Sequence, residues 1–450
     1  MIFLNISVDV VVTWKKHWYI SKLMTIMFYI LYKSDKIFEL TENNMSYKDI
    51  RINSFNLSPR DLNALYESRY NGESTIRLGF DINGFDSFVV LNPDLLNLMS
   101  SIYQLDKKLA LLSNQLPEEA LYQFKAISML EEIQQSNEVE NVQSTKKEIK
   151  DAYNAVKLGK QNKRFASMIK KYLLLQSDIE IPLNTCQQIR DLYDDFILDE
   201  VVKDDPNDQP DGVIFRQSTV KVLNSHNEVI HEGLYPESNI IIAMNRALAI
   251  LNNHDYDILI RTALFHYFFG FVHPFYNGNG RMTRFISSYM FSKYFSQAAC
   301  LRISYVINQN RRRYYELFRN ANDKRNKGEL TEFVTGYLTF FKDALKDTYV
   351  TLEEKNMLYK EYEGILNDWL KNNMSKISAT ERVCFKYLLQ AELFGESTLD
   401  INNVSKFMEC SEKTARKILA DAGQLVYSTK EGRKLIWHIN VKFLASLGEG

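Results

Sequence analysis

The residues with the clearest chemical potential lie in one short run, residues 273–284, which reads HPFYNGNGRMTR. A histidine can accept a proton near neutral pH, and an arginine presents a planar fork of donors that fits phosphate oxygens. Gly278 and Gly280 permit backbone conformations that other residues avoid, which predicts a turn. A histidine beside two arginines suits attack on a polyphosphate bond.

The elements around this run must position its side chains. An apolar, aromatic stretch at 263–272 precedes it, so the run predicts a loop that leads from one helix into the next. We expect the second helix to begin at Asn279 or Gly280. Its first turn then offers unpaired N–H groups and the positive end of a dipole, which together bind anions. Arg281 and Arg284 are three residues apart, so both project from one face beside that anion site.

The run resembles the motif of the Fic family, His-Pro-Phe-x-(Asp/Glu)-Gly-Asn-Gly-Arg-x-x-Arg. The resemblance implies transfer of AMP from ATP to a hydroxyl side chain of a protein, with His273 as the general base. It implies that Arg281 neutralises the leaving pyrophosphate and that Arg284 positions the terminal phosphate. The nucleotide-binding residues that it implies are Phe275, Gly278, Asn279, Gly280, Arg281, Arg284 and Asn310, the last because it precedes a Tyr-Tyr pair as a family Asn does.

Asn277 is the one fixed position at which the chain departs from the motif, which has Asp or Glu there. In the family that acid helps to hold a magnesium ion against the phosphates. An amide oxygen carries no charge, so we expect Asn277 to be a weak ligand for Mg²⁺ or Mn²⁺. The departure leaves other interpretations open: a nucleotide-binding Fic core that serves a DNA-binding regulator, or transfer from another nucleotide or a phosphocholine carrier.

Two further segments resemble parts of the family. Val220, Lys221 and Val222 alternate as a short strand would, which is similar to the flap hairpin that docks a target backbone as an added strand. Residues 136–141 read SNEVEN and fit the inhibitory pattern (Ser/Thr)-x-x-x-Glu-(Gly/Asn). The resemblance implies that Glu140 pairs with Arg284 and blocks the terminal phosphate of ATP. The inhibitory residues that it implies are Ser136, Glu140 and Asn141.

Composition sets broad limits. The chain has 450 residues, is 45% hydrophobic and carries a net charge of −1, so nothing in the balance demands nucleic acid or an anionic membrane. Four scattered cysteines form no CxxC pair, which favours a reducing, cytoplasmic location. The apolar run at 23–32 is shorter than the roughly 20 residues that cross a bilayer, so we expect no membrane partner. The expected partner is a protein with an acceptor hydroxyl, and the sequence leaves self-modification and a homo-oligomer open.

The C-terminal region differs in character. A capping-box pattern at 378–381 predicts a helix start, and residues 402–420 read as a helix-turn-helix followed by a tight hairpin. This order resembles a winged helix. The residues that would contact DNA phosphates are Lys413, Arg416, Lys417 and Arg433. A winged helix used for protein contacts or dimerisation is an equal alternative, because acidic residues dilute the charge.

The fold class that follows is mainly α: a Fic-type helical bundle with a β-hairpin flap, plus a C-terminal winged-helix (α+β) domain. We expect strands at 74–78 and 87–91, largely helical structure at 105–156, a loop at 201–212, and helices at 240–251, 257–272, 279–294, 311–322, 330–349 and 352–373. The expected domains are an extension at 1–45 whose place the sequence leaves open, an N-terminal region with the inhibitory helix at 46–200, a Fic catalytic core at 201–350, a helical linker at 351–377 and a winged-helix domain at 378–450.

Overall fold

The computed structural model describes residues 47–160, 163–177, 179–223, 229–374, 377–395, 399–431 and 434–448. The chain divides into two units, Met1–Lys48 and Asp49–Gly450. The expected extension at 1–45 lies outside the described residues, as does Arg433.

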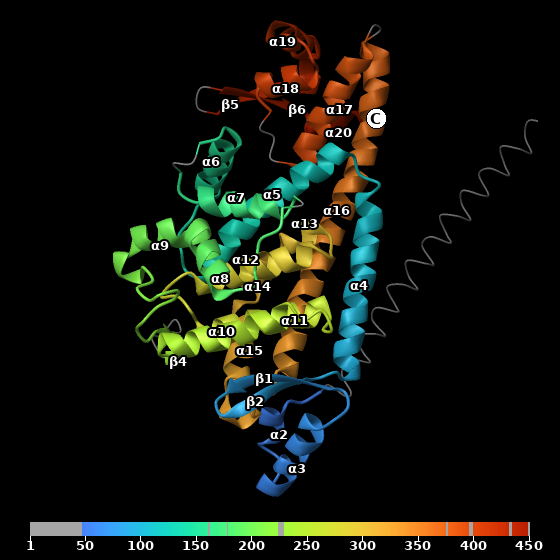
Figure 1. The fold of residues 1–450 in the computed structure, drawn as a ribbon. Helices are drawn as coiled ribbons and strands as arrows, with labels where there is room; N and C mark the ends of the chain where they lie inside the picture. Colours follow the sequence, from blue (N-terminus) through green and yellow to red (C-terminus); the bar gives the residue numbers. More distant parts are fainter. Residues whose placement is uncertain are drawn as a thin grey trace, which may run out of the picture. The chain divides into compact units, whose positions relative to one another are not determined.

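Helices make up most of the second unit, as the sequence predicts (Figure 1). The helices are α2 (Ile50–Asn53), α3 (Pro59–Tyr70), α4 (Pro93–Ser113), α5 (Glu118–Val139), α6 (Lys146–Lys157), α7 (Ala166–Leu174), α8 (Cys186–Tyr193), α9 (Asp199–Asp204), α10 (Glu237–Leu251), α11 (Ile258–Val272), α12 (Asn279–Ser292), α13 (Gln297–Cys300), α14 (Ile303–Gln309), α15 (Arg311–Ala321), α16 (Thr331–Asn373), α17 (Ala379–Phe394), α18 (Ile401–Phe407), α19 (Glu412–Asp421) and α20 (Val441–Gly448). Three antiparallel strand pairs are described: β1 (Thr75–Ile82) with β2 (Phe85–Val90), β3 (Lys221–Leu223) with β4 (Val229–Glu232), and β5 (Val426–Glu431) with β6 (Lys434–Ile439).

Helix α11 lies at the centre of the core. Of its 15 residues, 14 are buried, and it packs against α10, α12 and α16. A helix that is apolar on all sides is stable only when other elements surround it. Gly270 lets α15 approach closely, because a Cβ at that position would meet the ring of Phe318. The end of α11 is therefore held firmly where the HPFYNGNG loop begins.

Helix α16 corrects one expectation. The sequence predicts separate helices at 330–349 and 352–373, the second within a linker, but α16 runs without a break from Thr331 to Asn373. Buried residues continue through the expected junction at Leu345, Thr348, Leu352 and Tyr359. Helix α16 packs against α4 and α17, and the charged residues of its second half are exposed or half-buried, as is Glu363, which pairs with Lys386 of α17 at 2.8 Å.

The segment expected as a loop at 201–212 is also partly helical. Helix α8 continues through a π turn, η1 (Asp194–Leu198), into α9, and a 3₁₀ turn, η2 (Pro206–Asp208), follows. Asp205 caps this turn, since its side chain accepts from the N–H of Asn207 at 2.9 Å. Proline fixes its own φ, so Pro206 sets the start of the turn that places Asp208.

The C-terminal elements follow the predicted order. Ser378 and Glu381 form a capping box at the start of α17, and α18, α19 and the β5–β6 pair come next. Helix α20, which the sequence analysis did not anticipate, packs against α16. The name winged helix for this region stays a prediction. No helix in the described part of the chain combines the length and apolar character needed to cross a bilayer.

Candidate active site

The HPFYNGNG loop is fixed by its own hydrogen bonds. His273 caps α11 in the left-handed region (φ 52°), and its N–H donates to the carbonyl of Phe269 at 2.9 Å. The side chain of Asn279 grips the backbone of Phe275 twice, accepting from its N–H at 3.0 Å and donating to its carbonyl at 2.8 Å. Phe275 is buried and stacks on Tyr193 with ring centroids 3.7 Å apart. Phe275 thus anchors the loop in the core.

The two glycines do different work. Gly278 has φ 79° as the N-cap of α12, a conformation that side chains disfavour. Gly280 lies within the first turn of α12. The prediction that Gly280 serves an unusual backbone conformation was wrong, because glycine is required at this position by the lack of space for a side chain. A Cβ at Gly280 would overlap Oε1 of Glu140. The carboxylate of Glu140 therefore lies against the start of α12.

Arg216 fixes the backbone of the histidine from behind. Its side chain is fully buried and donates to the carbonyls of His273 (2.9 Å) and Leu234 (2.8 Å). It comes from the segment before β3, so it ties the strand pair to the loop. A buried guanidinium with several carbonyl partners holds a rigid position.

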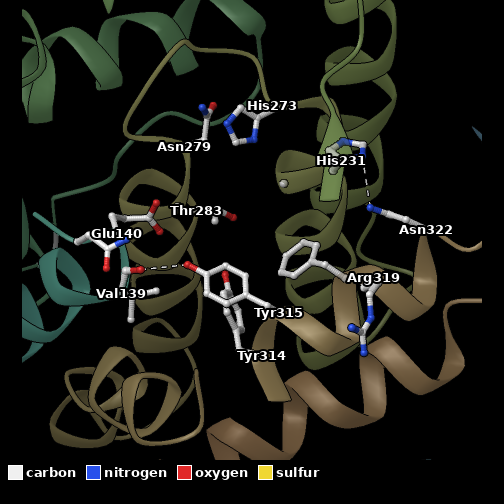
Figure 2. A pocket seen from close by; sticks show the side chains of 14 residues that line it. Val139, Glu140, His231, His273, Asn279, Thr283, Tyr314, Tyr315, Arg319 and Asn322 are labelled. Carbon is white, nitrogen blue, oxygen red and sulfur yellow. Dashed lines mark hydrogen bonds between the residues drawn. The ribbon is translucent and has the colours of Figure 1, made fainter. Parts of the chain in front are cut away.

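A pocket of about 260 Å³ opens beside His273 (Figure 2). Five predicted site residues line it: Glu140, Asn141, His273, Asn279 and Gly280. The other lining residues are Val139, His231, Gly270, Thr283, Tyr314, Tyr315, Phe318, Arg319 and Asn322. The buried hydroxyl of Thr283 finds no hydrogen-bond partner among the described residues, so a polar group faces the pocket ready for a ligand.

The charge state of His273 suits a base. Desolvation, together with the nearby His231 and Arg216, lowers the pKa of His273 to about 4, although Glu140 acts in the opposite direction. The imidazole is therefore neutral at pH 7 and can accept a proton.

Helix α5 delivers a carboxylate to the anion site at the start of α12. Arg284 is completely buried and donates from NH1 to Oε1 of Glu140 at 2.8 Å. It also donates from Nε to Oγ of Ser136 (3.1 Å) and from NH2 to the carbonyl of Ser136 (2.7 Å). Burial opposes the charged form of Glu140, but the charge and hydrogen bond of Arg284 outweigh it and lower the pKa of Glu140.

Asn141 explains the last position of the SNEVEN pattern. Helix α5 ends at Val139, Glu140 is its C-cap, and Asn141 follows with φ 58°. Gly and Asn are the residues that tolerate the left-handed region after a helix end. The side chain of Asn141 also accepts from Arg311 at 2.8 Å. The left-handed conformation of Asn141 thus ends α5 directly after Glu140, in the position from which the Glu140 side chain contacts Arg284.

Comparison with known proteins identifies the family of one segment. Residues 182–291 match the model of the Fic/DOC family. This segment is a Fic/DOC family domain. Two solved structures are similar: a Fic family protein from Desulfovibrio desulfuricans G20 (18% identity, 78% of this chain and 97% of that chain, TM-score 0.47) and a Fic domain containing signaling protein from Bacteroides thetaiotaomicron VPI-5482 (18% identity, 56% and 97%, TM-score 0.40).

Arg281 of the Fic domain is buried between Glu200 and Asn277 of the loop. Its guanidinium is 1% exposed, NH1 lies 3.6 Å from Oε2 of Glu200, and NH2 donates to Oδ1 of Asn277 at 3.4 Å. Nε and NH1 find no hydrogen-bond partner within the described ranges, and neither does Oε2 of Glu200. Burial raises the pKa of Glu200 to about 7, against the opposing charge of Arg281. This loosely paired guanidinium can still accept anionic oxygens.

The sequence analysis did not predict several residues that line the pocket, among them His231, Tyr315, Arg319 and Asn322. His231 donates from Nε2 to the carbonyl of Phe271 (2.6 Å), which leaves Nδ1 to accept from Asn322 (3.4 Å, Figure 2). Tyr315, on the α5 side, donates to the carbonyl of Val139 at 3.0 Å. Tyr315, Arg319 and Asn322 are spaced i, i+4 and i+7, so the helical repeat of α15 could have placed them on one face.

Asn310 does not reach the pocket. It lies between α14 and α15, and its side chain donates back to the carbonyl of Val306 at 3.0 Å. Of the asparagines near α15, it is Asn322 and not Asn310 that lines the pocket. Phe275, Gly278, Arg281 and Arg284 support the site from behind its lining.

The expected flap borders the site. Lys221 pairs with Glu232 and Val222 with His231 across β3 and β4, and the carbonyl of Val220 accepts from Gly233 at 3.0 Å. Lys221 is exposed, and its ammonium lies 3.5 Å from Glu232. The strand pair thus carries His231 to the pocket while Lys221 faces solvent.

The basic residues of the C-terminal helix α19 are exposed and partly neutralised. Lys413, Arg416 and Lys417 lie on the surface, and Arg416 pairs with Glu412 at 2.9 Å. Lys434 on β6 pairs with Asp400 at 2.5 Å. DNA binding by this face stays a prediction.

Proposed function

We propose that this protein is an adenylyltransferase that transfers AMP from ATP to a Ser, Thr or Tyr hydroxyl of a protein, and that Glu140 inhibits it in cis. One observation carries the proposal. A neutral histidine faces a pocket whose anion position, at the N-terminus of α12, is filled by a carboxylate of the same chain. That carboxylate stands where a phosphate would bind.

The reaction follows from the arrangement. The acceptor hydroxyl attacks the α-phosphorus, its proton passes to the imidazole of His273, and the bond to the departing pyrophosphate breaks. Asn279 fixes the loop, while Arg281 and the N–H groups of α12 face the developing charge. Most of the catalysis comes from positioning and preorganised charge, since the loop is rigid before substrate arrives.

A divalent cation fits the oxygen chemistry beside the loop. Asp208, which accepts a hydrogen bond from Asn277, supplies hard carboxylate oxygen atoms, which Mg²⁺ and Mn²⁺ prefer. Within the described residues no group of three or more metal-binding side chains gathers, so phosphate and water oxygens would complete the shell. When bound, the ion would neutralise charge on the departing pyrophosphate.

Inhibition follows from competition for Arg284. The pair is charge-assisted and its arginine is fully buried, so removing Glu140 leaves a buried arginine without its counter-charge. ATP must supply that charge through its terminal phosphate, which requires Glu140 to leave.

The four free cysteines also support a cytoplasmic location, where ATP is available.

The test is transfer of label from α-labelled ATP with Mg²⁺ or Mn²⁺, for the wild type, Glu140→Gly and Glu140→Gly/His273→Ala. Label that appears in Glu140→Gly and disappears in the double variant supports the proposal. Binding of ATP without transfer in any variant would favour the nucleotide-binding alternative. Label from another nucleotide or a phosphocholine carrier alone would change the donor and keep the mechanism.

A further inference from the structure

Asp208 lies beside the position where the motif lacks its acid. Nδ2 of Asn277 donates to Oδ2 of Asp208 at 3.0 Å, across 69 residues of chain. The turn that holds Asp208 is built for rigidity, with Pro206 at its start and a side-chain cap from Asp205. Asp208 is half-buried, so its carboxylate keeps a defined place against the loop.

The orientation of Asn277 is fixed by its other end. Oδ1 accepts from the N–H of Gly278 at 2.6 Å and from NH2 of Arg281 at 3.4 Å. The amide therefore presents its NH₂ group outward, towards Asp208. Turning the amide over would aim that group at two donors, which costs a hydrogen bond. Asn277 is thus better placed to hold a carboxylate than to coordinate a cation itself.

A second observation marks the same place as a ligand site. Arg281 is 1% exposed, and its Nε and NH1 atoms find no hydrogen-bond partner in the described part of the chain. Its NH2 atom meets the same Asn277 that holds Asp208. A buried guanidinium with open donors calls for anionic oxygens. Phosphate oxygens held by Arg281 and the carboxylate of Asp208 would both be oxygen ligands suited to a divalent cation.

On the proposed function, we infer that Asp208 is the protein's carboxylate ligand for the divalent cation that accompanies the nucleotide, with Asn277 orienting it. The negative charge that the family motif carries at the position of Asn277 is thus supplied by the carboxylate of Asp208 in η2. Carboxylates that bind metals are commonly held by a hydrogen bond from a neighbouring group, as Asn277 holds this one.

The test measures affinity and not turnover. In full-length protein carrying Glu140→Gly, the dissociation constant of α,β-methylene-ATP is measured by calorimetry in EDTA and in saturating Mn²⁺. Without metal, Asp208 repels the triphosphate; with metal, it attracts the cation. Asp208→Asn should therefore bind the analogue equally or more tightly in EDTA, and about tenfold or more weakly in Mn²⁺.

Two further variants sharpen the result. Asp204→Asn is the matched control, because it removes a charge from the same segment while its side chain faces Arg164. It should change neither constant by more than about twofold. The transposed pair, Asn277→Asp with Asp208→Asn, returns a carboxylate to the same spot and should restore the Mn²⁺ effect.

The outcomes separate the two ideas. If Asp208→Asn behaves like Asp204→Asn in Mn²⁺, or weakens binding equally in both conditions, the inference about Asp208 is overturned. If the parent binds the analogue neither in EDTA nor in saturating Mn²⁺, the proposed function fails and takes this inference with it. If the transposed pair restores the Mn²⁺ effect on the dissociation constant, a carboxylate at either of the two positions is sufficient, which supports the inference.

Discussion

The carboxylate of Glu140 lies 2.8 Å from the guanidinium of Arg284, although 144 residues of chain separate them. The same carboxylate rests against Gly280, where any side chain would displace it. The contact joins the end of α5 to the anion site at the start of α12. On the proposed function, a terminal phosphate of ATP competes with this contact.

Glu140→Gly should raise self-labelling from α-labelled ATP by about tenfold or more, because it removes the group that competes for Arg284. Initial rates at equal protein concentration are the measurement. Glu138→Gly is a matched control, since that carboxylate accepts from Asn308 and not from Arg284. Equal rates for both variants and the wild type would rule out this inhibition.

His273→Ala in the Glu140→Gly background should lower transfer by a factor of about 10² or more while leaving the dissociation constant of ATP within about threefold. The reason is that the imidazole acts on the acceptor proton and not on the phosphates. Labelling rates and calorimetric binding of ATP are compared on the same preparations. Persistent labelling would remove His273 from its assigned role.

The fall in rate on the acid side of the pH–rate profile should occur at low pH, well below the usual pKa of histidine. Desolvation lowers the pKa of His273 to about 4, so the base stays neutral as pH falls to 5.5. An unshifted histidine would be only about a quarter neutral at pH 6. Burial raises the pKa of Glu200 to about 7, so this carboxyl becomes neutral as the pH falls and no longer offsets the charge of Arg281. A fall in the Glu140→Gly rate centred near pH 6.5 would contradict this assignment.

Glu132 should make stability depend on pH. It lies one turn before Ser136 on α5, is fully buried, and accepts from the N–H of Ser304 at 2.8 Å. Desolvation raises its pKa from 4.5 to about 7. The folded state then binds the proton more tightly than the unfolded state, so this contribution is complete below pH 4.5 and is lost as pH rises through 7.

The measurement is urea unfolding followed by circular dichroism between pH 5 and 8. Glu132→Gln should reduce the loss of unfolding free energy over that range by about 3 kcal/mol at most. Glu131→Gln is the control, because Glu131 is partly exposed and pairs with Arg302. Identical pH slopes for wild type and Glu132→Gln would show that Glu132 is not protonated in the fold.

The exposed face of α19 can be tested without a known target. Changing Lys413, Arg416 and Lys417 to Ala should weaken binding to generic duplex DNA and flatten its salt dependence, since phosphate contacts release counterions. Fluorescence anisotropy at several salt concentrations is the measurement. Absence of binding by the wild type at low salt would leave protein contacts as the role of this region.

Sequence alone determined the local parts of the site. The start of α12 and the turn at Gly278, and outside the site the capping box at Ser378, all follow from residues within one or two helical turns of each other. Such features depend on fixed helical spacing and on φ preferences that each residue carries with it. The motif of the Fic domain could be read for the same reason.

Only the tertiary structure decided which distant groups meet. The separate helices expected on either side of residue 350 became one, because continuous burial against α4 and α17 prevailed over a change in composition. Asn322 lines the pocket and Asn310 does not, since the face that α15 turns to the pocket depends on its packing. Asp208 reached Asn277 because a π turn and Pro206 redirected the chain after α8, and long-range packing of this kind leaves no periodic signal in the sequence.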